Sequence, residues 1–165
     1  MQHTHKSTPF SLKKHTITLI CDGVSSPANI GGLLRLGDAF GVAQILFSNA
    51  VIDFTSPRLR KAARNSHTNI PHAMVDDIEG CIAEFKSQDY QVIALEISSM
   101  SKPIQKMESL DNQKIALVIG NEQHGVSAEA LAMVHETAHI EMFGLNSSMN
   151  VTQAAAIALF EFTKR

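Results

Sequence analysis

Residues 114–125 read KIALVIGNEQHG, an apolar, strand-like run that passes directly into a polar cluster bounded by two glycines. The same arrangement occurs twice more. The apolar run 17–21 leads into NIGGLLR at 29–35, and the run 139–143 leads into GLNSSMN at 144–150. In an open α/β sheet, ligands bind beyond the carboxyl ends of the parallel strands. We therefore expect the three clusters to converge at one edge of a sheet and to form one site.

Strand-like and helix-like segments alternate along the rest of the chain. Apolar or β-branched runs predict strands over 15–21, 44–47, 73–75, 91–97, 114–119 and 139–143. Helical spacing and capping residues predict helices from Pro27 to Gly41, from Pro57 to Arg64, from Asp76 or Asp77 to about Gln88, after Ser127, and from Val151 to Phe162. Residues 98–112 read as a polar connection. This alternation predicts an α/β fold with a mainly parallel sheet flanked by helices.

Composition bounds the class of protein. The chain has 165 residues, 44% hydrophobic and 18% charged, which is typical of one globular domain. Residues 1–14 are polar and are expected to form a flexible N-terminal arm, leaving 15–165 as a single domain. No apolar run approaches the roughly 18 residues of a membrane span, and the N-terminus lacks the apolar core of a signal peptide. We therefore expect a cytoplasmic protein without a membrane partner.

The cysteines and histidines give no sign of a metal site. Cys21 and Cys81 fall in a predicted strand and a predicted helix, where reduced, buried thiols fit better than a disulfide. No pair of cysteines or histidines has the spacing of a structural zinc site. We therefore expect no metal.

The glycine clusters do not match the common phosphate-binding motifs. Gly120 and Gly125 have the spacing of the first half of a P-loop, but Val126 and Ser127 replace its Lys-Ser/Thr pair. No GxGxxG motif surrounds Gly31 and Gly32. A role for the glycines in tight turns and close helix packing stays open beside a role in a ligand site.

Several polar residues of the three clusters are candidates for chemistry. Arg35 falls at the edge of the apolar stripe of its helix, where a guanidinium could bind a phosphate or stabilise developing negative charge, although a solvated helix arginine is the simpler interpretation. Glu122 could accept backbone N–H groups of its own turn. Ser148 and Asn150 precede the last helix, so they could also serve as N-caps.

A basic segment follows the predicted strand 44–47. Arg58, Arg60, Lys61 and Arg64 are four of the 14 Lys and Arg residues in a chain whose formal net charge is −2. Because the overall charge does not favour nucleic acid, any such binding depends on a local patch, and this helix is the best candidate together with Arg35. A solvated helix face is the alternative.

The ordered clusters resemble a known family. Its three motifs match Asn29-x-Gly31-x-x-x-Arg35-x-x-x-Ala39-Phe40-Gly41, then Gly120-Asn121-Glu122-x-x-Gly125, then Ser148-Met149-Asn150-Val151-Thr152-x-Ala154. This pattern resembles the SpoU (TrmH-like) branch of the SPOUT RNA methyltransferases, in the family's order and spacing from residue 15 onward. The resemblance implies a C-terminal trefoil knot, S-adenosylmethionine as the cofactor, methylation of a ribose 2′-oxygen of RNA, and a homodimer in which catalytic residues of one subunit face the cofactor of the other.

The resemblance also assigns roles to residues. It places the cofactor against Leu95, Gly120, Ile140, Ser148 and Met149. Asn29, Arg35, Glu122, Ser148 and Asn150 match the family's catalytic positions. We expect RNA to contact Arg35, Arg58, Arg60, Lys61 and Arg64.

Other functions remain open at this point. A non-catalytic RNA-binding module could have kept the fold, although the presence of Arg35, Glu122 and Asn150 speaks against it. A nucleotide-binding α/β enzyme of another class is disfavoured because no complete P-loop or dinucleotide motif occurs. The chain resembles the minimal catalytic domain of the small tRNA-modifying members, which favours transfer RNA over ribosomal RNA as the substrate.

Overall fold

The strands form one seven-stranded sheet with every pair parallel. The computed structural model describes residues 11–107, 113–146 and 148–164. The sheet order is β3-β2-β1-β6-β4-β7-β5. The strands are β1 (Ile17–Asp22), β2 (Gln44–Ser48), β3 (His72–Met74), β4 (Tyr90–Leu95), β5 (Lys102–Pro103), β6 (Lys114–Ile119) and β7 (Glu136–His139). The predicted parallel α/β fold is confirmed.

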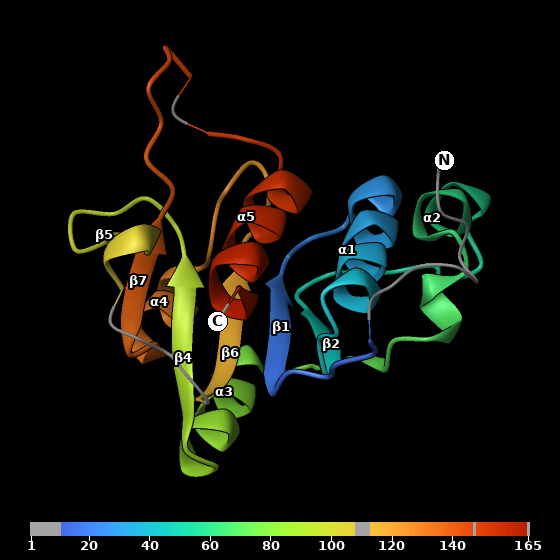
Figure 1. The fold of residues 1–165 in the computed structure, drawn as a ribbon, viewed down its shortest axis with the longest axis horizontal. Helices are drawn as coiled ribbons and strands as arrows, with labels where there is room; N and C mark the ends of the chain where they lie inside the picture. The colour runs from blue at the N-terminus through green and yellow to red at the C-terminus, as the bar shows by residue number, and fades with distance from the viewer. Residues whose placement is uncertain (1–10, 108–112, 147, 165) are drawn as a thin grey trace.

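Helices cover both faces of the sheet. In Figure 1, α1 (Pro27–Ala39) and α5 (Val151–Thr163) lie in front of the sheet, whereas α3 (Ile78–Ser87) and α4 (Ala128–Met133) lie behind it. The short helix α2 (Pro57–Ala63) packs on α1. Two 3-10 turns, 66–68 and 104–106, complete the described elements.

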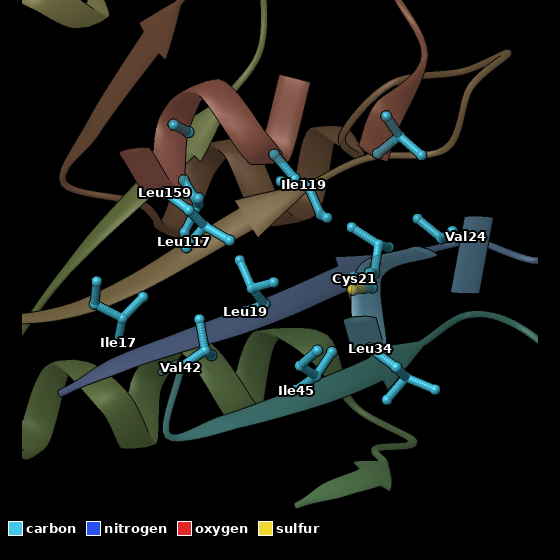
Figure 2. Close-up of a cluster of buried hydrophobic side chains, with 14 of the residues drawn as sticks. Ile17, Leu19, Cys21, Val24, Leu34, Val42, Ile45, Leu117, Ile119 and Leu159 are labelled. Carbon is cyan, nitrogen blue, oxygen red and sulfur yellow. The ribbon is translucent and has the colours of Figure 1, made fainter. Parts of the chain in front are cut away.

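Alternating side chains of the central strands build two hydrophobic cores. On β1, Leu19 and Cys21 point into the core beneath α1 and α5, while Ile20 points to the opposite core beneath α3. Figure 2 shows the first core, with Leu117 of β6 and Leu159 of α5 gathered over β1. Because β1 and β6 are buried on both faces, they read as nearly continuous apolar runs.

Local sequence explains where the helices begin and how closely they pack. Proline occupies the first helical position of α1 and α2, where its missing N–H costs no hydrogen bond. The Asp77 side chain caps α3 by accepting a hydrogen bond from the Gly80 amide at 3.0 Å. A Cβ on Gly31 would lie 2.3 Å from the carbonyl oxygen of Leu59, so glycine is needed where α1 meets α2. The packing role proposed for this glycine is therefore confirmed.

The prediction of a strand over residues 139–143 was wrong. β7 spans Glu136–His139, and residues 140–143 lie outside any strand. The β5–β7 ladder pairs Lys102 with Ala138 and Pro103 with His139, and it ends there. On the other side of β7 the β4 ladder ends at Leu95 and Ala138, and β5 passes into the 3-10 turn 104–106, so residues 140–143 have no strand to pair with. The polar residues that open β7 do not resemble a buried strand.

Two other segments differ from the expectation. The connection 98–112 contains β5 and a 3-10 turn, and its last five residues lie outside the described structure. Most of the predicted N-terminal arm, residues 1–10, also lies outside it, while Ser11 to Lys14 are exposed and without regular structure.

The two cysteines are buried free thiols, as predicted. Burial raises the pKa of the Cys81 thiol to about 11 and raises the pKa of Cys21 further still. They lie in different cores, so both behave as small apolar groups. No helix in the described part of the chain combines the length and hydropathy that crossing a membrane requires.

His135 links the start of β7 to β4 through two hydrogen bonds. Its amide donates to the Val92 carbonyl at 2.9 Å, and its Nδ1 accepts from the Val92 amide at 3.0 Å. Burial lowers the pKa of His135 and nearby Lys86 lowers it further, while Glu136 opposes both. The folded protein therefore holds His135 neutral at pH values where the unfolded chain begins to protonate it.

This histidine predicts a pH-dependent stability. Its contribution is present above the ordinary histidine pKa near 6.5 and is lost as the pH falls through the lower folded value. His135→Asn keeps a hydrogen-bond acceptor but does not titrate, so urea unfolding should show a shallower fall in stability from about pH 7 to pH 5. His124→Asn, in an exposed turn, is the control. Equal slopes for wild type and His135→Asn would contradict the prediction.

Candidate functional site

The second and third polar clusters line a cavity of about 600 Å³ at the carboxyl edge of the sheet, and the first cluster reaches its rim through Asn29, which hydrogen-bonds Glu122. Its walls are the segments that leave β4, β6 and β7, together with the first turn of α5. That volume is within the range of roughly 300–1,000 Å³ found for small-molecule sites. The described lining residues are Leu95, Glu96, Ile97, Ile119, Gly120, Asn121, Glu122, Gln123, His124, Gly125, Val126, Leu131, His139, Ile140, Met142, Ser148, Met149, Val151 and Ala154.

The structure brings together all five residues expected to contact a cofactor. Leu95 ends β4, Gly120 follows β6, Ile140 follows β7, and Ser148 and Met149 precede α5, yet all five line this one cavity. They are separated by up to 54 positions in the sequence. Their convergence follows from the parallel sheet, which places the carboxyl ends of β4, β6 and β7 side by side.

Three of the expected catalytic residues form a chain of hydrogen bonds that joins the three clusters. The Asn29 side chain on α1 donates through Nδ2 to the Glu122 carboxylate. The Asn150 side chain donates through Nδ2 to the Asn29 Oδ1 at 3.0 Å. Asn150 also caps α5, because its Oδ1 accepts the Thr152 amide at 2.9 Å. The capping interpretation and the site interpretation of Asn150 therefore hold together.

Within one copy of the protein, Arg35 is not part of this hydrogen-bonded group. Its side chain is exposed on α1 and is not among the described residues that line the cavity. Arg35 is six positions after Asn29, which corresponds to about 9 Å along the helix and a rotation of about 120°. Ser148, by contrast, lies in the cavity wall. The expected catalytic set is thus divided between the cavity and an outer surface.

The four basic residues of the second predicted helix also lie outside the cavity. Arg58, Arg60, Lys61 and Arg64 are all exposed on α2 and at its C-terminal end. None of them pairs with a described carboxylate within 4.0 Å. α2 packs against α1, the helix that carries Arg35.

The buried carboxylate of Asp22, which was not among the residues predicted for the site, fixes the 120–127 segment. Asp22 is 3% exposed at the end of β1. Its carboxylate accepts the Ser127 amide and the Asn49 side-chain amide, both at 2.8 Å. Nearby, the Asn121 side chain donates to the Gly23 carbonyl at 2.7 Å. An acidic residue that closes a strand whose only other polar residue is Thr18 was the signal that could have identified this role.

The glycines of the 120–125 segment have a conformational role. Asn121 and Gly125 exchange backbone hydrogen bonds of 3.0 and 2.8 Å, which folds the segment back on itself. A Cβ on Gly120 would lie 2.1 Å from the carbonyl carbon of Gly125, so no side chain fits there. The Glu96 carboxylate, which belongs to the segment after β4, holds this turn in place by accepting a hydrogen bond from the Val126 amide at 3.0 Å. Glu96 was expected inside a strand, but β4 ends one residue earlier.

The lining of the cavity is acidic. It includes the carboxylates of Glu96 and Glu122 and the imidazoles of His124 and His139, and no lysine or arginine occurs among its described residues. Such a surface attracts a cationic ligand and repels a polyphosphate. Apolar side chains supply much of the remaining wall, which suits a ligand that has both a flat apolar part and a positive charge.

Known proteins share both the sequence pattern and the fold. The model of the SpoU rRNA Methylase family matches residues 16–160. The chain is 27% identical over 142 residues to the 23S rRNA (guanosine(2553)-2′-O)-methyltransferase RlmP of Bacillus subtilis, covering 86% of this chain and 56% of that protein. It is 27% identical over 146 residues to the tRNA (guanosine(18)-2′-O)-methyltransferase of Escherichia coli, covering 88% and 62%. The chain thus spans only part of the length of these relatives.

A solved structure extends the similarity to three dimensions. The AdoMet-bound rRNA methyltransferase from Sinorhizobium meliloti superposes with a TM-score of 0.84 at 26% identity, over 94% of this chain and 58% of that one. The family match begins one residue before β1 and ends inside α5, so it includes all three clusters and the cavity between them. This chain therefore belongs to the SpoU rRNA Methylase family, as its motifs predicted.

Proposed function

We propose that this protein is an S-adenosylmethionine-dependent RNA methyltransferase that modifies a ribose 2′-oxygen. The observation that carries the proposal is the cavity lined by the second and third clusters, with Asn29 of the first cluster hydrogen-bonded to Glu122 and Asn150 at its rim. Relatives from the same family are named 2′-O-methyltransferases of tRNA and of 23S rRNA. Of these two classes we favour tRNA, and we place the reaction in the cytoplasm.

The cavity fits this cofactor by its charge and its shape. When bound, S-adenosylmethionine supplies an electrophilic methyl group on a positively charged sulfur. The carboxylates of Glu96 and Glu122 suit that charge, and Leu95, Ile140 and Met149 offer apolar contact to an adenine ring. A solved relative is described as AdoMet-bound. The non-catalytic RNA-binding alternative does not account for an acidic cavity of this size.

The residues around the cavity have different roles in the proposed methyl transfer. Asn29, Glu122 and Asn150 fix one another and so shape the rim at which a ribose must be placed, and such positioning supplies much of the rate of a displacement reaction. Arg35 binds the neighbouring phosphate and stabilises negative charge on the 2′-oxygen as its proton leaves. A guanidinium stays protonated across the accessible pH range, so an electrostatic role suits Arg35 better than that of a base.

The position of Arg35 supports a homodimer. Within one chain Arg35 is exposed on α1 and lies outside the described wall of the cavity, a position from which it is free to face the mouth of the cavity in a second copy. The exposed face of α5 carries Ile157 and Phe160, which are 37% and 57% exposed. Apolar residues on a helix next to the site suit a contact between subunits.

The C-terminal chain path supports the trefoil knot implied by the family. From β4 the chain runs to β5 at the sheet edge, returns to the centre as β6, and then inserts β7 between β4 and β5. The segment after β7 rises above the sheet in Figure 1 before α5 descends over it. We propose that this path is threaded as a knot.

A direct test joins cofactor binding to activity. Calorimetry should detect S-adenosylmethionine binding to the wild-type protein, and labelled methyl groups should pass to the ribose 2′-oxygen of tRNA more readily than to that of rRNA. Arg35→Ala should lower transfer by at least about 100-fold, the cost of removing a preorganised electrostatic group, with cofactor affinity nearly unchanged. Absence of cofactor binding by the wild type would refute the proposal. Equal loss of binding and transfer in Arg35→Ala would show that Arg35 is structural.

The dimer predicts complementation between two inactive variants. Ala154→Trp fills the cavity wall and should abolish cofactor binding, while Arg35→Ala keeps the cavity. If Arg35 serves the cavity of the other subunit, co-expressing the two variants should restore about a quarter of the wild-type rate, since half of randomly mixed dimers would have one complete site. No recovery in mixed dimers confirmed by mass spectrometry would mean that Arg35 acts within its own chain.

The basic surface on α2 predicts a salt-dependent RNA contact. Replacing Arg58, Arg60 and Lys61 together by alanine should weaken tRNA binding and reduce its salt dependence, by a slope of roughly one unit or less for each lost phosphate contact. Replacing the exposed Lys102, Lys106 and Lys114 instead is the control for loss of three charges. Equal affinities for wild type and the α2 variant, measured at two salt concentrations, would remove α2 from the RNA surface.

A further inference from the structure

One side chain in the cavity wall has no part in the functions proposed above. His139 ends β7 and lines the cavity, and its Nδ1 lies 2.9 Å from the Ser101 hydroxyl. It belongs to none of the three motifs. Ser101 lies in the turn between β4 and β5, so two separate segments hold this imidazole in place.

The hydrogen bonds of Ser101 determine which nitrogen of His139 carries the proton. The Ser101 hydroxyl donates to the Ser98 carbonyl at 2.8 Å and accepts from the Ser98 amide at 3.0 Å. A hydroxyl has one hydrogen to donate and two lone pairs to accept with. Because its hydrogen is already used, the third partner must be a donor. For the uncharged ring, this count of partners places the proton on Nδ1 of His139 and leaves Nε2 as an acceptor.

We propose that His139 is a cofactor-recognition residue whose Nε2 accepts a hydrogen bond from the adenosine half of S-adenosylmethionine. The proposal rests on the function proposed above. His139 lies between Ala138, which pairs with Leu95 on β4, and Ile140, and both Leu95 and Ile140 line the cavity. This is the apolar part of the wall, which suits the adenine ring. The 6-amino group and the ribose hydroxyls are the donors that an adenosine offers there.

Ser101 acts in this proposal as a positioning residue. It holds the ring and fixes the tautomer without lining the cavity itself. Without its hydroxyl, the neutral imidazole would be free to carry its proton on either nitrogen. A ring protonated on Nε2 presents a donor to the cofactor's own donors. Loss of the Ser101 hydroxyl should therefore weaken cofactor binding from a distance.

The test measures binding of S-adenosylmethionine and of 5′-methylthioadenosine, which lacks the amino-acid half. His139→Asn keeps a donor near Ser101 but removes the distal nitrogen, so it should weaken both ligands by about tenfold, the usual value of one hydrogen bond. Ser101→Ala should also weaken the binding of both ligands. Ser101→Thr keeps the hydroxyl, so it should bind both ligands with nearly wild-type affinity. Weakening of S-adenosylmethionine alone would overturn the assignment to the adenosine half.

Matched controls separate recognition from folding. His72 on β3 is also half-buried with its Nδ1 2.9 Å from an oxygen, that of Ile70, but it lies at the opposite edge of the sheet. His72→Asn should leave both affinities unchanged, as should Ser87→Ala, whose hydroxyl donates to a backbone carbonyl on α3. Equal thermal stability of the His139 and His72 variants would exclude a folding defect.

A second readout does not depend on ligand binding. Nitrogen–proton correlation spectra of the imidazoles should show His139 of the free protein as the neutral form protonated on Nδ1, and Ser101→Ala should lose that preference. Protonation on Nε2 in the wild type would overturn the proposal. If the wild type binds S-adenosylmethionine and His139→Asn binds it equally well, His139 is not a recognition residue. If the wild type does not bind it at all, the proposed function itself fails.

Discussion

The pairing of β1 with β6 is the constraint on which the site depends. Their parallel register sets Cys21 opposite Ile119, so the Asp22 carboxylate and the 120–127 segment emerge at the same edge of the sheet. Two buried strands aligned in this way leave little room for a shift, because a slip by one residue would turn every apolar side chain to the other core. The Asp22 carboxylate and the Asn121 side chain then tie the segment to the β1–α1 turn. Hydrophobic packing thus fixes the position of the polar groups at the rim.

The formal net charge of the protein is only −2, but its acidic and basic side chains lie on two separate surfaces. The carboxylates of Glu96 and Glu122 line the cavity, whereas the described basic side chains of α2 lie outside it. An arginine inside the cavity would oppose a sulfonium, and a carboxylate on α2 would oppose a phosphate. Keeping the groups apart would allow both proposed ligands to bind, although it leaves Arg35 on the outer surface. The homodimer proposed above would reconcile that position with a role of Arg35 in the proposed reaction.

The sequence predicted the fold class and the convergence of the clusters, because both follow from alternating periodicity and from the parallel sheet. Its failures have physical causes. The strand 139–143 was misplaced because apolar alternation says nothing about whether a partner strand exists, and here the ladder ends at Pro103. Asp22 was missed because an Asp-Gly pair is also typical of an ordinary turn. Glu96 was assigned to the interior of a strand and His139 to the start of one, whereas Glu96 follows the end of β4 and His139 is the last residue of β7, because strand ends are not visible from sequence.

Hydrogen bonds between distant side chains were beyond sequence reasoning altogether. The spacing of Asn29, Glu122 and Asn150 does not specify their contact, since each lies on a different element. The parallel sheet predicted that their clusters lie at one edge, but only the family resemblance singled out these three residues as one catalytic set. His139 had no such guide, and its role emerges only from counting the partners of the Ser101 hydroxyl. A fully satisfied polar network holds its members in one arrangement, because any rotation leaves a buried donor or acceptor without a partner. Side chains outside the motifs can therefore orient a ligand as firmly as those within them.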